Sequence, residues 1–252
     1  MGAAKWIAGV LGWAALGPIG GLLGYILGSV VDKRIDRILQ PGGDGGGQRA
    51  AGYRSYTATE QRNSFLISLL VLSAAVIKAD GRTLQSELDY VKDFVRRNFG
   101  EAAVPEAMRM LDDLGRQNID IYSVGRQIAS YMNYSQRLQL FHYLTQIAIA
   151  DGEFSKSEKS VLEAIAGAMG ISAQDAASVI SMFYKDTGSA YSVLGISPTA
   201  TDDEVKTAYR RMAMKNHPDK VATLGPEVQK AASEKFRQVQ EAYEAIKRER
   251  GL

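Results

Sequence analysis

The 252-residue chain contains no cysteine, and this absence excludes disulfides, cysteine-based zinc sites, iron–sulfur clusters and a thiol nucleophile. Histidine is scarce. His142 lies in an apolar helical run, where we expect a satisfied core or boundary residue, and His217 stands directly before a proline. Because there is also no P-loop, G-x-S-x-G or H-E-x-x-H motif, we expect neither an enzyme nor a bound cofactor. The net charge of +2 is too weak to indicate nucleic-acid binding.

The N-terminal part of the chain has a long segment without charge. Residues 6–31 read WIAGVLGWAALGPIGGLLGYILGSVV. As a helix with ~1.5 Å rise per residue, this segment would be about 39 Å long and could cross a hydrocarbon core of roughly 30 Å with some tilt. It is too long for the core of a secretory signal, and no clear cleavage site follows it. We therefore predict a single transmembrane helix over residues 6–31, after a short non-cytoplasmic tail at residues 1–5.

The residues around and inside this segment predict its orientation and its contacts. Lys33 and Arg34 follow it closely, so the positive-inside bias favours a cytoplasmic C-terminal portion. Gly20, Gly24 and Gly28 recur every four residues and put three positions without side chains on one helix face. A second helix could approach closely there, which would give a homodimer, although glycine is also common in membrane spans.

Residues 32–60 are first basic and then rich in glycine, and the stretch PGGDGGGQ predicts a flexible linker. An internal repeat follows in residues 61–185. The segments KADGRTLQSE (78–87) and IADGEFSKSE (149–158) both contain Ala-Asp-Gly, with a glutamate seven residues after the aspartate. Each lies between an apolar helical run and an amphipathic one, which indicates two copies of a helix–turn–helix in an all-helical domain. In the second copy, Ser155 and Glu158 match a capping box.

Four acidic residues of the repeat allow two interpretations. They are Asp80, Glu87, Asp151 and Glu158. Their spacing lacks the dense D-x-D-x-D-G run of a calcium-binding loop, which favours a structural role in helix caps and turns over a firm metal site. As a converging set, they could instead bind a divalent cation through oxygen ligands. The repeat resembles the TerB family of tellurite-resistance-associated helical domains, which implies an all-helical bundle and identifies no ligand.

After a short linker at residues 186–189, residues 190–252 predict a hairpin of two helices. Thr201 and Glu204 match a capping box at the start of the first helix, and Pro218 ends it. Apolar side chains at helical spacing form one face of this helix, and we expect the basic side chains to lie on its solvent side, at Lys206, Arg210, Arg211 and Lys215. A second helix is predicted over residues 227–247, so that an exposed loop carries His-Pro-Asp at one end of the hairpin.

The segments YSVLGI, VKTAYRRMAMKNHPDK and EKFRQVQEAYEAI together resemble a J domain. With the predicted membrane helix and the TerB-like repeat, this makes the chain similar to the DjlA-like family of membrane-anchored DnaJ-like co-chaperones. The resemblance implies an all-α protein with one transmembrane helix, a TerB-like bundle and a J-domain hairpin. It also implies the bacterial inner membrane, with a periplasmic N-terminus and cytoplasmic C-terminal domains. Family members often have an aromatic residue before the histidine, where this chain has Asn216.

The implied activity is regulation of a partner. A J domain binds a DnaK-type chaperone in its ATP state and stimulates its ATP hydrolysis. Carried over by position, the docking residues and the triggering tripeptide are Tyr209, Arg210, Arg211, Lys215, His217, Pro218 and Asp219. The chain lacks the Gly/Phe-rich and zinc-binding regions of full DnaJ proteins, so recruitment of the chaperone to the membrane is favoured over broad client binding. The alternative is an envelope-stress or metal-responsive adaptor that acts through the acidic residues of the TerB-like domain.

Overall fold

The computed structural model describes residues 58–152, 154–183 and 190–251, and these residues form an all-helical fold without a β-strand. The predicted transmembrane helix over 6–31, with Gly20, Gly24 and Gly28, lies outside the described residues. Within the described part, no helix combines the length and the apolar character that crossing a bilayer requires.

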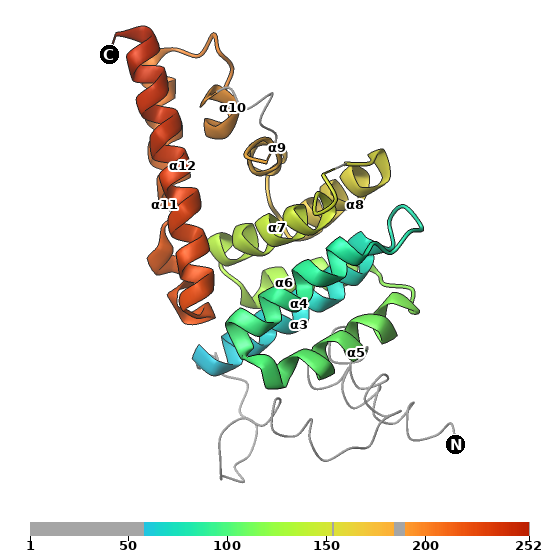
Figure 1. The fold of residues 1–252 in the computed structure, drawn as a ribbon. Coiled ribbons are helices and arrows are strands. Elements are labelled where there is room, and N and C mark those ends of the chain that lie inside the picture. The colour runs from blue at the N-terminus through green and yellow to red at the C-terminus, as the bar shows by residue number, and fades with distance from the viewer. Residues whose placement is uncertain (1–57, 153, 184–189, 252) are drawn as a thin grey trace, which may run out of the picture.

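Seven α-helices and one 3₁₀ turn form a bundle in the first part of the described chain (Figure 1). They are α3 (Ala58–Ile77), α4 (Gln85–Phe99), η1 (Glu101–Ala103), α5 (Val104–Gly115), α6 (Ile121–Tyr131), α7 (Tyr134–Ala148), α8 (Lys156–Ala168) and α9 (Ala173–Ser181). The core helix is α3, which packs against α5 and α7 and buries apolar side chains around most of its circumference, among them Phe65, Leu69, Leu70 and Leu72. A helix with apolar residues on all sides is expected in the interior of a domain.

The two repeated segments adopt the predicted turns. Gly81 and Gly152 both have positive φ, at 77° and 89°, the left-handed region that glycine enters without a steric cost. The Glu158 carboxylate accepts the Ser155 backbone N–H at 2.7 Å, and Ser155 Oγ accepts the Glu158 N–H at 3.1 Å, which confirms the capping box. In the first copy, the Glu87 carboxylate likewise accepts a backbone N–H three residues upstream, at 2.9 Å.

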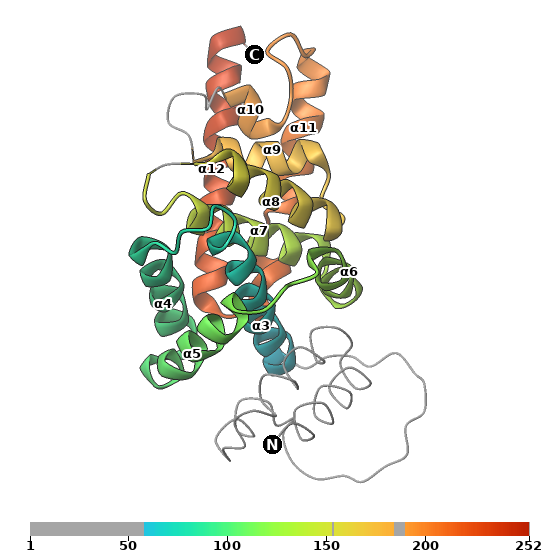
Figure 2. The same cartoon turned by 90° about the vertical axis from the view of Figure 1, so that its right-hand side faces the viewer.

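The C-terminal region forms the predicted hairpin. It consists of α10 (Ala190–Leu194), α11 (Asp202–Lys215), η2 (Pro218–Leu224) and α12 (Pro226–Arg250). The helices α11 and α12 pack against each other: α12 lies in front of α11 in Figure 1, and the two are seen beside each other in Figure 2. The capping box at the start of α11 is confirmed, since Thr201 Oγ1 accepts the Glu204 N–H at 3.3 Å and Glu204 accepts the Thr201 N–H at 2.7 Å. A small core between the helices contains Leu194, Val205, Met212, Val239 and Ile246.

The loop between α11 and α12 differs from the expected exposed loop. Val221 and Leu224 in η2 are each 1% exposed, and with Val228 and Ala232 of α12 they belong to the same buried cluster as the core of the bundle. Val221 and Leu224 are three residues apart in η2, so both fall on one side of this 3₁₀ segment. That side of η2 contacts α3 and α7. The bundle and the loop end of the hairpin therefore share one hydrophobic core, and the rest of the hairpin keeps its own smaller core.

Candidate partner-binding site on the C-terminal hairpin

The His-Pro-Asp tripeptide lies where α11 gives way to η2. Pro218 is the first residue of η2, a position that suits its fixed φ and its missing N–H. His217 precedes it in an extended conformation, and its Nδ1 accepts the Asp219 backbone N–H at 3.3 Å. The His217 ring also meets the edge of Phe236 on α12, with the ring centroids 5.7 Å apart. These contacts hold the His217 ring in place while its side chain remains 45% exposed, and that of Asp219 is 80% exposed.

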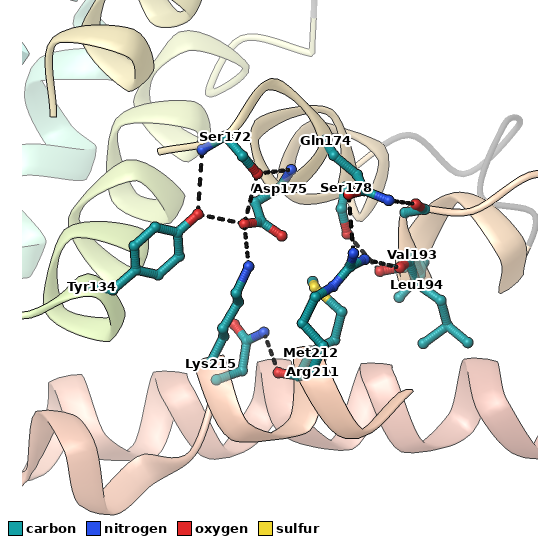
Figure 3. A network of polar contacts seen from close by, with 12 residues as sticks. Tyr134, Ser172, Gln174, Asp175, Ser178, Val193, Leu194, Arg211, Met212 and Lys215 are labelled. Carbon is teal, nitrogen blue, oxygen red and sulfur yellow. Dashed lines mark hydrogen bonds and ion pairs between the residues drawn. The ribbon is translucent and has the colours of Figure 1, made fainter. Parts of the chain in front are cut away.

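The basic side chains of α11 divide between two faces. Lys206 and Arg210 are exposed, and Met214, which lies one turn further on the same face, is 59% exposed. Arg211 and Lys215 point instead toward α9, and Lys215 is only 25% exposed (Figure 3). The expectation that all four basic side chains lie on the solvent side is therefore wrong for these two. The reason is that the solvent side of an isolated hairpin is, in this chain, partly covered by the bundle.

A buried carboxylate on α9 is the partner of Lys215 (Figure 3). Asp175 is 1% exposed, and its Oδ2 accepts hydrogen bonds from Lys215 Nζ at 2.5 Å, from Ser172 Oγ at 2.8 Å and from the Tyr134 hydroxyl. The Lys215 ammonium also lies 4.8 Å from the centroid of the Tyr134 ring. Burial by itself would raise the pKa of Asp175, but the hydrogen bonds from Lys215, Tyr134 and Ser172 outweigh burial and hold the pKa below its ordinary value.

Arg211 makes a second link between the hairpin and the bundle. Its Nη1 donates to Oε1 of Gln174 on α9 at 3.0 Å, and its Nη2 donates to the Leu194 carbonyl of α10 at 3.0 Å. Gln174 Nε2 in turn donates to the carbonyl of Gly195. The Ser178 hydroxyl of α9 donates to the Val193 carbonyl (Figure 3). One face of α9 is thus bonded to both α10 and α11.

Sequence reasoning missed the residues of the bundle that hold the hairpin. Ser172 and Asp175 carry a local signal, because the Ser172 hydroxyl caps α9 by accepting the Asp175 N–H at 3.1 Å. No local signal connects Asp175 with Lys215, which lies 40 residues away. Tyr134, at the start of α7, is likewise distant in sequence from both partners.

Two buried nitrogen-bearing side chains lie where η2 and α12 meet the bundle. His142 on α7 is 1% exposed, as expected for a core residue. Burial, together with the charge of Lys235, lowers the pKa of His142 well below its ordinary value, against the opposing effect of the Asn216 side chain. Lys235 is 7% exposed, its ammonium lies 4.3 Å from the centroid of the Phe183 ring, and burial lowers its pKa to about 8.

The four acidic residues of the repeat lie near one another in the bundle. Burial raises the pKa of Glu87 to about 7, against the effect of the Leu84 N–H that its carboxylate accepts, and the charges of Glu158, Asp80 and Asp151 raise it further. Asp80 accepts the Arg82 backbone N–H at 2.9 Å, which closes the first turn. In the described residues, no three His, Asp or Glu side chains are grouped closely enough to hold a metal ion.

Comparison with known protein families finds three matching regions in sequence order. The co-chaperone DjlA transmembrane domain matches residues 1–51, the tellurite resistance protein TerB matches residues 66–180, and the DnaJ domain matches residues 189–250. The hairpin with its His-Pro-Asp turn therefore corresponds to the DnaJ domain, and the helices from α3 to α9 correspond to the TerB region.

Similar whole proteins align with this chain along most of their length. The protein named co-chaperone protein DjlA from Coxiella burnetii is 27% identical to this chain, covering 98% of both sequences. The proteins of that name from Photobacterium profundum and Shewanella oneidensis are 26% and 29% identical, with 98% and 90% of this chain covered, and 99% and 89% of theirs. No solved structure matches the chain. The chain is therefore DjlA-like, with a DjlA transmembrane domain, a TerB region and a DnaJ domain in that order.

Proposed function

We propose that the chain is a membrane-anchored co-chaperone whose J domain binds a DnaK-type chaperone and stimulates its ATP hydrolysis. The observation that carries this proposal is the turn at His217, Pro218 and Asp219. The ring of His217 is fixed by Phe236 and by the Asp219 N–H, and yet both polar side chains remain open to solvent. A side chain that is already ordered loses little entropy when a partner binds it, so a fixed and exposed turn suits recognition.

The surface beside the turn has the charge that such a partner needs. Lys206 and Arg210 are exposed on the same face of α11, next to the exposed Met214. Tyr209 is held beside them by stacking on Tyr243, with the ring centroids 4.2 Å apart. Exposed basic groups steer encounter with an acidic partner surface, and they do so less effectively as the salt concentration rises.

The membrane part of the proposal is supported by the comparisons and by the uncharged segment over residues 6–31. A DjlA transmembrane domain matches residues 1–51, and similar proteins carry the DjlA name. Lys33 and Arg34 after the segment favour a cytoplasmic position for the bundle and the J domain. Tethering of the J domain would raise the local concentration of the chaperone next to its clients at the inner membrane.

Single-turnover ATP hydrolysis by a DnaK-type chaperone tests the function. The full chain, reconstituted in nanodiscs, is added to the ATP-loaded chaperone beside a His217→Gln variant, and Asp219→Asn is the second variant. We expect the wild-type chain to accelerate hydrolysis and both variants to lose the acceleration. Acceleration that survives in both variants, or no acceleration by the wild-type chain, would refute the proposal.

A further inference from the structure

The bundle holds the J domain at two separate places. Near the end of α11, Lys215 bonds the buried Asp175, which also accepts from Tyr134. Beyond the His-Pro-Asp turn, Val221 and Leu224 are buried in the core of the bundle. The tripeptide lies between these two anchors in sequence. Its position is therefore fixed by contacts that come from the bundle as well as from the hairpin.

These two anchors are costly to release. Separation of the hairpin from the bundle would expose Val221, Leu224 and Val228, all of which are now almost fully shielded from water. It would also break the ion pair between Lys215 and Asp175 and leave Asp175 with the neutral donors Tyr134 and Ser172. A partner that captured Lys215 would have to replace this ion pair and also offset the exposure of the three apolar side chains. Binding to the docked hairpin is therefore favoured over binding that first separates it.

We propose that the bundle, through Asp175 and Tyr134, holds the J domain in a fixed orientation. In this arrangement, a DnaK-type chaperone reaches the J domain over the outer face of α11 and the His-Pro-Asp turn, while Arg211 and Lys215 act as positioning residues. This inference rests on the proposed function. Arg211 and Lys215 were expected at the docking face, and the inference gives them contacts within the chain instead of contacts with the partner.

The exposed fractions on α11 support this division. Arg210 and Met214 are one turn apart and exposed, and His217 continues the same face beyond the end of the helix. Arg211 is bonded to Gln174 and to the Leu194 carbonyl, so its guanidinium is already engaged in two directions. The surface left for the partner therefore consists of Arg210, Met214 and the His-Pro-Asp tripeptide, and α9 covers the neighbouring face of α11.

Thiol labelling of the shared core tests whether the hairpin stays docked in the complex. Because the chain has no native cysteine, a single introduced thiol reports one position. Leu224→Cys places it in the shared core, and Thr223→Cys places it at the neighbouring exposed position as a matched control. Labelling of the full chain in nanodiscs is followed by mass spectrometry, with and without saturating ATP-bound chaperone. Val228→Cys is the second buried position, should Leu224→Cys fail to stimulate hydrolysis.

We expect the buried thiol to react at least about tenfold more slowly than the exposed one, because it reacts only when the core opens. Addition of the chaperone should leave that slow rate unchanged. If the chaperone accelerates labelling of the buried thiol toward the rate of Thr223→Cys, the hairpin separates on binding and the inference is wrong.

A titration of the chain into the chaperone ATPase assay tests the positioning role. It gives two quantities, the maximal stimulated rate and the chain concentration at which half of that rate is reached. We expect Arg210→Gln to raise the half-maximal concentration about 5- to 10-fold at low salt and to leave the maximal rate unchanged. Tyr134→Phe and Lys215→Met should instead lower the maximal rate and leave the half-maximal concentration nearly unchanged. Combining Lys215→Met with Asp175→Asn should cause no further loss, because both substitutions remove the same contact.

The measurements are made at a temperature at which circular dichroism shows each variant to be folded. If Lys215→Met shifts the half-maximal concentration as Arg210→Gln does, Lys215 contacts the partner and the inference fails while the proposed function stands. If the wild-type chain does not stimulate hydrolysis, and His217→Gln is indistinguishable from it, the proposed function fails and the inference falls with it.

Discussion

The shared core predicts that damage inside the J-domain loop destabilises the bundle. Leu224 is 1% exposed and packs in the buried cluster that also contains Phe65 and Leu69 of α3. Replacement of a fully buried leucine by alanine costs ~2–5 kcal/mol, through lost burial and the cavity that remains. For a fold of this size, each kcal/mol lowers the melting temperature by roughly 2–4 °C. With a mid-range loss of about 3 kcal/mol, Leu224→Ala should lower the melting temperature by roughly 6–12 °C.

Two measurements on the full chain check this prediction. The helical signal in circular dichroism gives the melting temperature, and hydrogen exchange read by mass spectrometry shows which helices lose protection. We expect faster exchange in α3 and α7 of the bundle as well as in η2 and α12. Met214→Ala on the outer face of α11 is the matched control, because Met214 is 59% exposed and its truncation should change stability by less than about 0.5 kcal/mol.

The reasoning would be refuted by an independent response of the two regions. If Leu224→Ala lowers protection in η2 and α12 while α3 and α7 exchange as in the wild-type chain, the hairpin and the bundle unfold separately. A change in melting temperature no larger than that of Met214→Ala would show that Leu224 is not in the core. Either result would also remove the apolar anchor on which the fixed orientation of the J domain depends.

Three further predictions concern the bundle and its contact with α12. Because the folded pKa of Glu87 is about 7, above its ordinary 4.5, its contribution to stability is present below pH 4.5 and is lost as the pH rises through 7. Glu87→Gln should therefore flatten the fall in melting temperature across that range, and parallel curves for the two proteins would contradict the prediction. Lys235→Met removes a buried ammonium and keeps a side chain of similar length. Urea unfolding should therefore show unchanged stability or a gain of up to ~2 kcal/mol. A clear loss of stability would show that the ammonium over the Phe183 ring is stabilising. A Cβ at Gly125 would lie 2.4 Å from Ala168 Cβ. Gly125→Ala should therefore force α6 away from α8 and lower the free energy of unfolding in urea by ~1–3 kcal/mol. An unchanged urea midpoint would mean that the two helices separate easily.

Much of the fold could be predicted from the sequence because its signals are local. The capping boxes at Ser155 and Thr201 each place an acceptor three residues before the group that it satisfies, and both are present. The end of α11 near Pro218 follows from the steric restriction that proline places on the preceding residue. Gly81 and Gly152 mark turns that need a left-handed backbone.

The orientation of the J-domain face could not be predicted, because it depends on what lies opposite. Arg211 and Lys215 have the spacing of exposed side chains on a helix, and an isolated hairpin would leave them in water. Their partners, Gln174 and Asp175, are on another helix, and no periodic pattern relates the two segments. The burial of Leu224 could not be predicted either, because an apolar residue in a short loop does not indicate which helices will cover it.

Asn216 shows how the bundle changes what the J-domain sequence means. It stands where family members often have an aromatic side chain, and it is 6% exposed, with Nδ2 donating to the Met212 carbonyl at 2.9 Å. Asn216 is thus buried, and Arg211 and Lys215 point toward α9, so three side chains near the end of α11 face the interior of the protein. Because the bundle and the loop share a core, a ligand that binds only the folded bundle would also stabilise the position of His217. The shared core thus gives the TerB region a direct physical route to the J domain, without any contact between such a ligand and His217.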